Sequence, residues 1–436
     1  MNKSLNLIII LIFITGCSFN KNSKFWTNSE IINEDDREDV NYVEVFPKEE
    51  ALKKEFNSGL RLKFTSKTAS STSDNNYLNN NGRLNFDGSL KKSSRYKFSK
   101  IKNFDQYQPE ISFYRNNVLF FDNKGSILKF NNESKLIWKK NYYSRSEKKL
   151  NPIIQIINNG KYLLVADNIA KTYMLNLHNG NLLWLKNNLA PFNSQIKILD
   201  DKFFIIDFSN TLRCFSLNDG SELWNIQTEN SLIRSQKKLS MVIINEIIYF
   251  NNSVGDISAV DIKKGELLWQ LPTQSSLIYE SAFSLQTSDI ISDKESLFFS
   301  NNKNQFFSID IKSGTFNWEN KINSNITSSL IDNYLISISL EGYLIITEKN
   351  SGNIIRVTDV FKNFKPKKRK KIKPTGFVMG LNNFYLSTNN GRILVIDVTS
   401  GKTKSALKID NEKISRPIIL DKNLFVVKDN AIIKLD

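Results

Sequence analysis

Gly255-Asp-Ile-Ser-Ala-Val-Asp-Ile-Lys-Lys-Gly-Glu-Leu-Leu-Trp269 is the stretch that decides the fold, because variants of it recur along the chain. The seven copies end at equivalent positions: Trp138, Trp184, Trp224, Trp269, Trp318, Arg356 and Ser405. Successive copies end 46, 40, 45, 49, 38 and 49 residues apart. A period of about 40–50 residues is typical of proteins built from one repeated structural unit.

Each copy predicts a hairpin of two short apolar strands around a polar turn, as in Val260-Asp-Ile-Lys-Lys-Gly-Glu266. Six of the seven copies have Gly four positions before the end, and Ser134 takes its place in the first copy. Glycine adopts positive φ at little cost and so closes such a turn with a bulge. Two further apolar stretches precede the hairpin, at 239–244 and 247–250 in the fourth copy. Four strands per repeat indicate a propeller blade.

The two ends of the repeat region predict how the ring closes. The chain ends in three strand-like stretches, 417–420, 423–427 and 431–435, which would leave an open sheet edge. Residues 95–101 alternate between apolar and polar side chains and are the candidate fourth strand. The sequence therefore predicts an all-β fold over residues 95–436, an eight-bladed β-propeller of four-stranded antiparallel blades whose last blade is closed by an N-terminal strand.

Residues 1–17 have the pattern of an export signal. Lys3 is followed by an apolar run from Leu7 to Ile14, which is too short to span a bilayer. Ile14-Thr15-Gly16-Cys17 resembles the lipobox of bacterial lipoproteins, which implies cleavage and acylation at Cys17. Ser18, where an Asp would imply inner-membrane retention, implies the outer membrane. An ordinary signal peptide with a chance Cys is the alternative.

Residues 18–94 lack the repeat and are rich in Asn, Ser, Lys and acidic residues. Such a composition buries little apolar surface, and we expect mostly flexible tether here. The stretch 42–46 alternates like a strand and 48–56 could form one or two helical turns, and either could pack on the flank of the propeller.

Charge and reactive residues limit the function classes. The net charge of +16 by itself suggests an acidic partner, but a chain biased to Lys, Asn and Ile throughout is the preferred explanation. The basic segment 365–373 is either a solvated loop or a contact with anionic headgroups or an acidic protein surface. Beyond Cys17 the chain has Cys214 on an apolar strand and His178 in a turn, so we expect no disulfide, no Cys/His zinc site and no catalytic triad.

The Gly-x-x-x-Trp signature, with Asp closing the preceding strand, resembles the tryptophan-docking repeat of quinoprotein-like propellers. The resemblance implies that Trp138, Trp184, Trp224, Trp269 and Trp318 lock neighbouring blades together. Two families share this repeat. The quinoprotein dehydrogenases hold pyrroloquinoline quinone and Ca²⁺ in the channel and commonly have adjacent cysteines, which this sequence lacks.

The second family is BamB, the lipoprotein scaffold of the outer-membrane β-barrel assembly machinery. This resemblance covers residues 95–436 and includes the Cys17 motif. It implies a partner-binding segment at Asn230-Ser-Leu-Ile-Arg234, with Leu232, Ile233 and Arg234 contacting the periplasmic domains of a BamA-like subunit. The two aliphatic residues could equally begin the next strand. The acidic pair of the family's next loop is replaced by Ser284-Leu-Gln-Thr287.

We therefore expect a lipid-anchored scaffold on the periplasmic face of the outer membrane, a monomer within a complex, that assists insertion of outer-membrane proteins. We expect no enzyme activity, no cofactor, no metal and no nucleic acid, and unfolded outer-membrane proteins are a further expected partner. Two alternatives stay open: a quinone-dependent periplasmic dehydrogenase and a propeller that binds cell-wall glycan.

Overall fold

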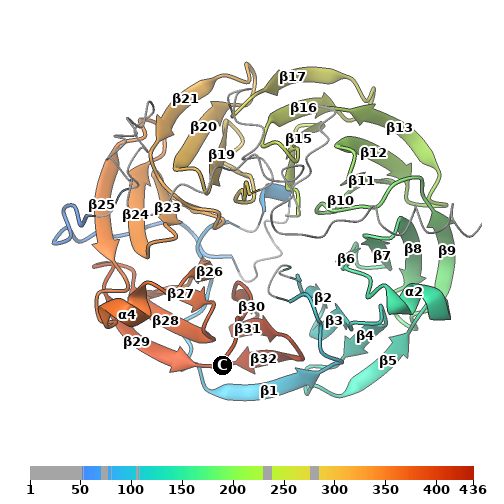
Figure 1. Ribbon diagram of the computed structural model, residues 1–436, viewed down its shortest axis with the longest axis horizontal. Helices are drawn as coiled ribbons and strands as arrows, with labels where there is room; N and C mark the ends of the chain where they lie inside the picture. Colours follow the sequence, from blue (N-terminus) through green and yellow to red (C-terminus); the bar gives the residue numbers. More distant parts are fainter. Residues whose placement is uncertain are drawn as a thin grey trace, which may run out of the picture. The chain divides into compact units, whose positions relative to one another are not determined.

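Eight antiparallel sheets of four strands each are arranged as a ring (Figure 1). The computed structural model describes residues 52, 54–69, 77–79, 81–104, 107, 109–228, 238–274 and 284–436, all within the unit Glu49–Asp436. The sheets follow one another in chain order, and in the seven sheets made of four consecutive strands the first strand lies nearest the axis. The predicted eight-bladed propeller is confirmed.

The first four blades each take four consecutive strands. Blade 1 contains β2 (Ser112–Tyr114), β3 (Asn117–Phe121), β4 (Ile127–Phe130) and β5 (Leu136–Lys140). Blade 2 contains β6 (Ile154–Asn158), β7 (Tyr162–Asp167), β8 (Lys171–Asn176) and β9 (Leu182–Asn187). Blade 3 contains β10 (Lys197–Leu199), β11 (Lys202–Ile206), β12 (Thr211–Ser216) and β13 (Glu222–Gln227). Blade 4 contains β14 (Met241–Ile244), β15 (Ile247–Asn251), β16 (Ile257–Asp261) and β17 (Leu267–Leu271).

The next three blades follow the same plan. Blade 5 contains β18 (Ile291–Ser292), β19 (Ser296–Asn301), β20 (Gln305–Asp310) and β21 (Phe316–Asn320). Blade 6 contains β22 (Ser329–Ile331), β23 (Tyr334–Ile338), β24 (Tyr343–Glu348) and β25 (Ile354–Asp359). Blade 7 contains β26 (Pro374–Met379), β27 (Asn383–Thr388), β28 (Arg392–Asp397) and β29 (Thr403–Lys408).

Blade 8 is a composite of the two ends of the ring. Its inner strands are β30 (Ile418–Leu420), β31 (Asn423–Lys428) and β32 (Ala431–Leu435), and β1 (Lys92–Lys97) pairs antiparallel with β32. The closing strand thus lies at 92–97 rather than 95–101. The backbone N–H groups of Phe98 and Ile101 donate to Asn430 and Asp429 in the turn before β32, so the segment leaves the ladder after Lys97.

The outer hairpin of each complete blade has the predicted bulge. In blade 4 the register of β16 and β17 shifts between Ala259 and Val260, and Gly265 has a φ of 71°. The Asp261 carboxylate accepts the backbone N–H groups of Lys263 and Lys264, which fixes the turn before the glycine.

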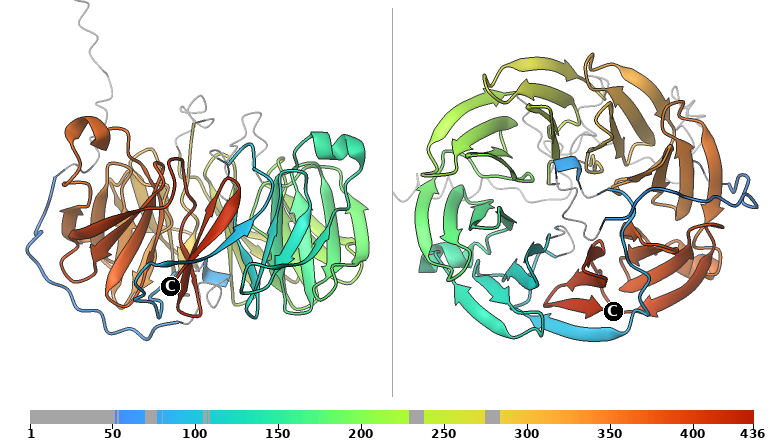
Figure 2. Two further views of the ribbon diagram at one scale, coloured as in Figure 1. Left: turned by 90° about the horizontal axis from the view of Figure 1, so that it is seen from below. Right: turned by 180° about the vertical axis from the view of Figure 1, so that it is seen from behind.

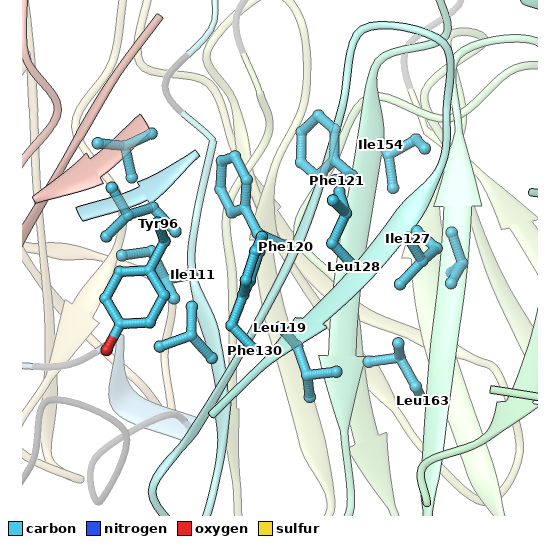
Figure 3. Close-up of a cluster of buried hydrophobic side chains, with 14 of the residues drawn as sticks. Tyr96, Ile111, Leu119, Phe120, Phe121, Ile127, Leu128, Phe130, Ile154 and Leu163 are labelled. Carbon is cyan, nitrogen blue, oxygen red and sulfur yellow. The ribbon is translucent and has the colours of Figure 1, made fainter. Parts of the chain in front are cut away.

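The core lies between neighbouring sheets. The middle strands are buried along most of their length, as in β3 and β4, whereas the outer strand β5 is largely exposed. Figure 3 shows the cluster in which Tyr96 of β1 meets the side chains of blade 1. The Tyr96 and Phe130 rings pack edge to face at 5.7 Å, so the closing strand also seals the junction between blades 8 and 1.

Two short helices lie in the connections between blades. Helix α2 (Arg145–Lys149) joins β5 to β6, and α4 (Pro366–Arg369) joins β25 to β26. Both stand at the same end of the ring, which we call the helix face (Figure 2). The opposite end, with the turns of the outer hairpins, is called the turn face. Within the described ranges, no helix has the length and apolarity needed to cross a membrane.

Candidate functional site

Contacts between blades involve the repeat tryptophans, all of which donate the indole N–H to a backbone carbonyl of the next blade. The pairs are Trp138 to His178 (3.0 Å), Trp184 to Leu217 (3.0 Å), Trp224 to Ile262 (3.1 Å), Trp269 to Ile311 (3.1 Å) and Trp318 to Lys349 (2.8 Å). Each ring also lies against the turn glycine of that blade. A Cβ added to Gly314 would lie 2.5 Å from Cδ2 of Trp269.

Arg356 occupies the tryptophan position of blade 6 and is fully buried. Its guanidinium donates to the carbonyls of Thr399 and Val398 in the turn of blade 7. It also donates to the Leu60 carbonyl at 2.9 Å, which brings in a segment that precedes the ring. Desolvation lowers the pKa of Arg356 to about 10. No pattern in the repeat predicts this second contact of Arg356.

Tyr96 has the same role in blade 8. Its hydroxyl donates to the Asn132 carbonyl at 3.0 Å, in the outer turn of blade 1, and its ring is buried. The turn contains Ser134 in place of glycine, with a φ of 64°. Tyr96 reaches this position because β1 pairs with β32. The sequence pattern predicts this closing strand a few residues too late, at 95–101.

The described residues before β1 form an N-terminal strap (54–69, 77–79 and 81–91) on the blades. Phe56 pairs with Val357 of β25 through two backbone hydrogen bonds, at 3.1 and 2.8 Å. Farther along, Leu84 and Phe86 are buried against blades 7 and 8, and the Leu84 N–H donates to the Met379 carbonyl. Phe56 belongs to the stretch 48–56 that is expected to pack on the flank, whereas the contacts of Leu84 and Phe86 fall in the range predicted as mostly flexible tether and are not indicated by its polar composition.

The strap also enters the axis of the ring, where Figure 1 shows it as a short blue helical segment. We call residues 77–79 the axial turn. The Asn79 amide donates to Ser240 Oγ (2.9 Å) and to the Ile290 carbonyl (2.6 Å), and its Oδ1 accepts from Lys197 Nζ (2.7 Å). Asn79 is 3% exposed. One side chain therefore connects the inner strands of blades 3, 4 and 5.

Lys197 is the ionisable group of this contact. Desolvation lowers the pKa of Lys197 to about 8, and Glu110 and Asp289 partly oppose this effect. Lys197 is held by Asn79 among other partners, so its position is fixed by a hydrogen-bond network. Such a network explains the buried amine without invoking a reaction.

The other reactive residues have structural surroundings. His178 is exposed in an outer turn, and its backbone carbonyl accepts the Trp138 indole. Cys214 is buried, and desolvation raises the pKa of its thiol to about 12, which keeps it protonated at neutral pH. Among the residues that the structure describes, no three His, Cys, Asp or Glu side chains are grouped to hold a metal ion.

The rim of the ring presents apolar side chains on outer strands. Those of blades 1 to 5 are between 39% and 49% exposed: Leu136, Ile137, Leu182, Leu183, Leu223, Leu267, Leu268 and Phe316. They immediately precede the tryptophan positions and so recur with the repeat. Outer strands also have unpaired backbone groups along one edge. The isolated bridge between Phe56 and Val357 of β25 shows that such an edge accepts backbone hydrogen bonds from another part of the chain.

The partner-binding residues predicted from the sequence, Leu232, Ile233 and Arg234, lie outside the described residues, as does Cys17. They belong to the connection between β13 and β14, of which the described end Lys238 forms an ion pair with Glu110. In the following connection Leu285 is buried and Gln286 bonds to Asn325, so the stretch that replaces the acidic pair packs on blades 5 and 6.

Comparison with known proteins gives a family and a fold. The family model described as outer membrane protein assembly factor BamB matches residues 123–358. The crystal structure of BamB from Moraxella catarrhalis is similar, with a TM-score of 0.64 and 13% identity over 80% of this chain and 99% of that one. The crystal structure of the computationally designed Ika8 protein has a TM-score of 0.58 and 12% identity over 78% and 99% of the two chains. No curated protein sequence matches the chain.

Proposed function

The chain belongs to the family of outer membrane protein assembly factor BamB, and from this premise we propose that it is a lipid-anchored, non-enzymatic scaffold of the machinery that inserts β-barrel proteins into the outer membrane. In this role it holds the barrel-forming subunit through loops and extended client segments through its rim. Acylation of Cys17 keeps it at the periplasmic face of the membrane.

The observation that carries the proposal is the pairing of Phe56 with Val357 on the outer edge of blade 6. One residue of the chain's own N-terminal strap forms an isolated β-bridge to this outer strand, which is a single-pair version of the contact made in β-augmentation. Blades 1 to 5 offer similar outer strands with exposed apolar side chains, such as Leu183 and Leu268. Unfolded outer-membrane proteins contain extended segments with alternating apolar residues, which complement such edges.

The axis of the ring favours a scaffold over a dehydrogenase. A quinone in the channel would need the space next to the inner strands, where the axial turn bonds to blades 3, 4 and 5. The adjacent cysteines common in quinoprotein dehydrogenases are also missing from the sequence. Addition of quinone and Ca²⁺ to the purified protein should therefore give no dye reduction, and dye reduction would revive that alternative.

The expected partner contact lies in the connection between β13 and β14. Leu232 and Ile233 would supply apolar anchors and Arg234 a charged one, the combination found at the centres of protein interfaces. Affinity purification from membranes at native expression tests this. We expect the barrel-forming subunit to be recovered, and Arg234→Glu to weaken the recovery at least tenfold.

The matched control is Arg145→Glu, which reverses the charge of an exposed arginine in the connection between β5 and β6. It should leave recovery unchanged. Failure to recover the subunit with the unaltered chain would refute the proposed role, whereas equal loss in both variants would refute the assignment to Arg234.

The rim is tested separately with a photo-crosslinking residue placed at Leu183 or Leu268, both on outer strands. We expect crosslinks to outer-membrane proteins during their synthesis. The control position is Lys312, which is exposed in an outer turn away from any strand edge. Equal crosslinking at Lys312 would exclude edge-specific capture.

A further inference from the structure

The connection between β25 and β26 (360–373) lies on the helix face and is held there by specific contacts. Phe361 and Ile372 are buried in the core of blades 6 and 7. Arg369 of α4 forms an ion pair with Asp359 and lies 5.5 Å from the Tyr343 ring centroid. These contacts fix both ends of the helix and one of its sides, so α4 holds its other side chains in defined positions.

The exposed lysines of this connection, of which Lys367 and Lys368 belong to α4, form what we call the lysine patch. Its members are all exposed: Lys362, Lys365, Lys367, Lys368, Lys370, Lys371 and Lys373. The nearby acidic groups already have partners, because Asp359 pairs with Arg369 and Glu55 with Lys362. Among the described residues, the other six lysines have no ion-pair partner. The patch therefore presents a concentrated positive charge to an outside partner.

The strap begins beside this patch. Glu55 accepts from Lys362 Nζ (3.1 Å) and from the Asp359 N–H (3.2 Å), and Phe56 pairs with the same strand, β25. Cys17 precedes Glu55 by 38 residues. As the predicted tether, such a segment would have an r.m.s. span of roughly 35 Å. An acyl chain on Cys17 would thus keep the lysine patch within reach of lipid headgroups.

We propose that the lysine patch of α4 is a second membrane contact, which binds anionic lipid headgroups next to the point where the tether joins the ring. The inference rests on the proposed lipid anchoring of Cys17 for its setting in the cell, although the patch itself stands on described residues. A basic cluster beside a lipid anchor adds electrostatic attraction to anionic headgroups, at about 1 kcal/mol for each lysine near the surface. The patch would add this attraction and orient blades 6 and 7 toward the bilayer.

Vesicle sedimentation tests the patch apart from the anchor. The full chain with Cys17→Ser, which cannot be acylated there, is mixed with phosphatidylcholine vesicles containing 30% phosphatidylglycerol or none, at about 0.1 M salt. The neutral vesicles measure any binding by the apolar leader. We expect binding to the anionic vesicles to exceed that background and to fall as salt rises.

The test variant changes Lys365, Lys367, Lys368, Lys370 and Lys371 to Gln. Binding to anionic vesicles should fall at least about 25-fold, because the loss of even two of the five lysines from the surface, at about 1 kcal/mol each, accounts for that change. The control changes five exposed lysines in turns of the turn face to Gln: Lys135, Lys263, Lys264, Lys312 and Lys422. It loses the same net charge and should retain most of the binding.

Equal loss in the two variants would overturn the proposal, because net charge alone would then explain the binding. Binding that ignores lipid charge, together with loss of a protein partner in the five-lysine variant, would overturn it in favour of an acidic protein surface. The proposed anchoring fails independently if labelled palmitate is not incorporated into the unaltered chain, and that result would leave the vesicle comparison intact.

Discussion

Arg356 gives the sharpest test of how the blades and the strap are joined. Its guanidinium donates to the Leu60 and Thr399 carbonyls, and hydrogen bonds from a charged donor contribute about 1.5–3 kcal/mol each. Burial of the charge opposes this, because a pKa lowered from 12.5 to about 10 corresponds to roughly 3 kcal/mol. Truncation to alanine adds a cavity cost of about 2 kcal/mol. We expect Arg356→Ala to lower the free energy of unfolding by about 2–5 kcal/mol in urea titrations.

Arg356→Trp separates the two contacts. An indole at this position can donate to the turn of blade 7, as in the other blades, but leaves the Leu60 carbonyl without its donor. We expect stability within about 2 kcal/mol of the unaltered protein, together with faster trypsin cleavage of the strap after Arg61 and Lys63. Trp224→Phe is the control, since it removes one donor between blades 3 and 4, in a core cluster that contains no strap residue, and should leave that cleavage rate unchanged. An Arg356→Ala protein of unaltered stability, or unaltered strap cleavage in Arg356→Trp, would refute the reasoning.

Three further predictions concern single positions. Gly314 has a φ of 68° and lies against the Trp269 ring, so Gly314→Ala should lower the unfolding free energy by at least about 2 kcal/mol. Gly160 has a φ of 86° but faces open space, so Gly160→Ala should lower it by only about 1 kcal/mol. Equal losses in the two variants would contradict the proposed contact between the tryptophan and the turn glycine. Asn79→Ala should cost about 2–4 kcal/mol in urea titrations, because it removes one hydrogen bond each from Lys197, Ser240 and the Ile290 carbonyl, and a neutral result would mean that the axial turn is not held. Folding lowers the pKa of Lys197 from 10.5 to about 8, so between these pH values the unfolded chain binds more protons and the stability of the folded protein rises with pH. Between pH 8 and 10, the unfolding free energy of the unaltered protein should therefore rise by about 1–3 kcal/mol relative to that of Lys197→Met. A difference between the two proteins that does not change with pH would refute the pKa shift.

The sequence was sufficient for the architecture because its dominant signal is local. A Gly-x-x-x-Trp hairpin repeats with the blade, and every outer turn can be located from one glycine or its substitute. The closing strand was placed a few residues late, since the alternating stretch at 95–101 extends beyond the point where the backbone leaves β32.

Other features of the structure depend on long-range contacts that no local sequence pattern predicts. Arg356 and Tyr96 stand at the position that tryptophan has in blades 1 to 5, and each donates a hydrogen bond to the next blade, although neither resembles tryptophan in the sequence pattern. The strap is polar, and it is held by backbone pairing at Phe56 and by one buried amide at Asn79, each matched to groups hundreds of residues away in the chain. The roles of Leu232, Ile233 and Arg234 stay predictions, as does acylation of Cys17.

The central claim is that this ring works by holding a partner and not by chemistry in its channel. Calorimetric titration of the purified protein with the purified periplasmic domains of the barrel-forming subunit tests this most directly. The account predicts a saturable complex of one protein per subunit, weakened at least tenfold by Arg234→Glu and unaffected by Arg145→Glu. Absence of heat and of complex at micromolar concentrations of both proteins would contradict it.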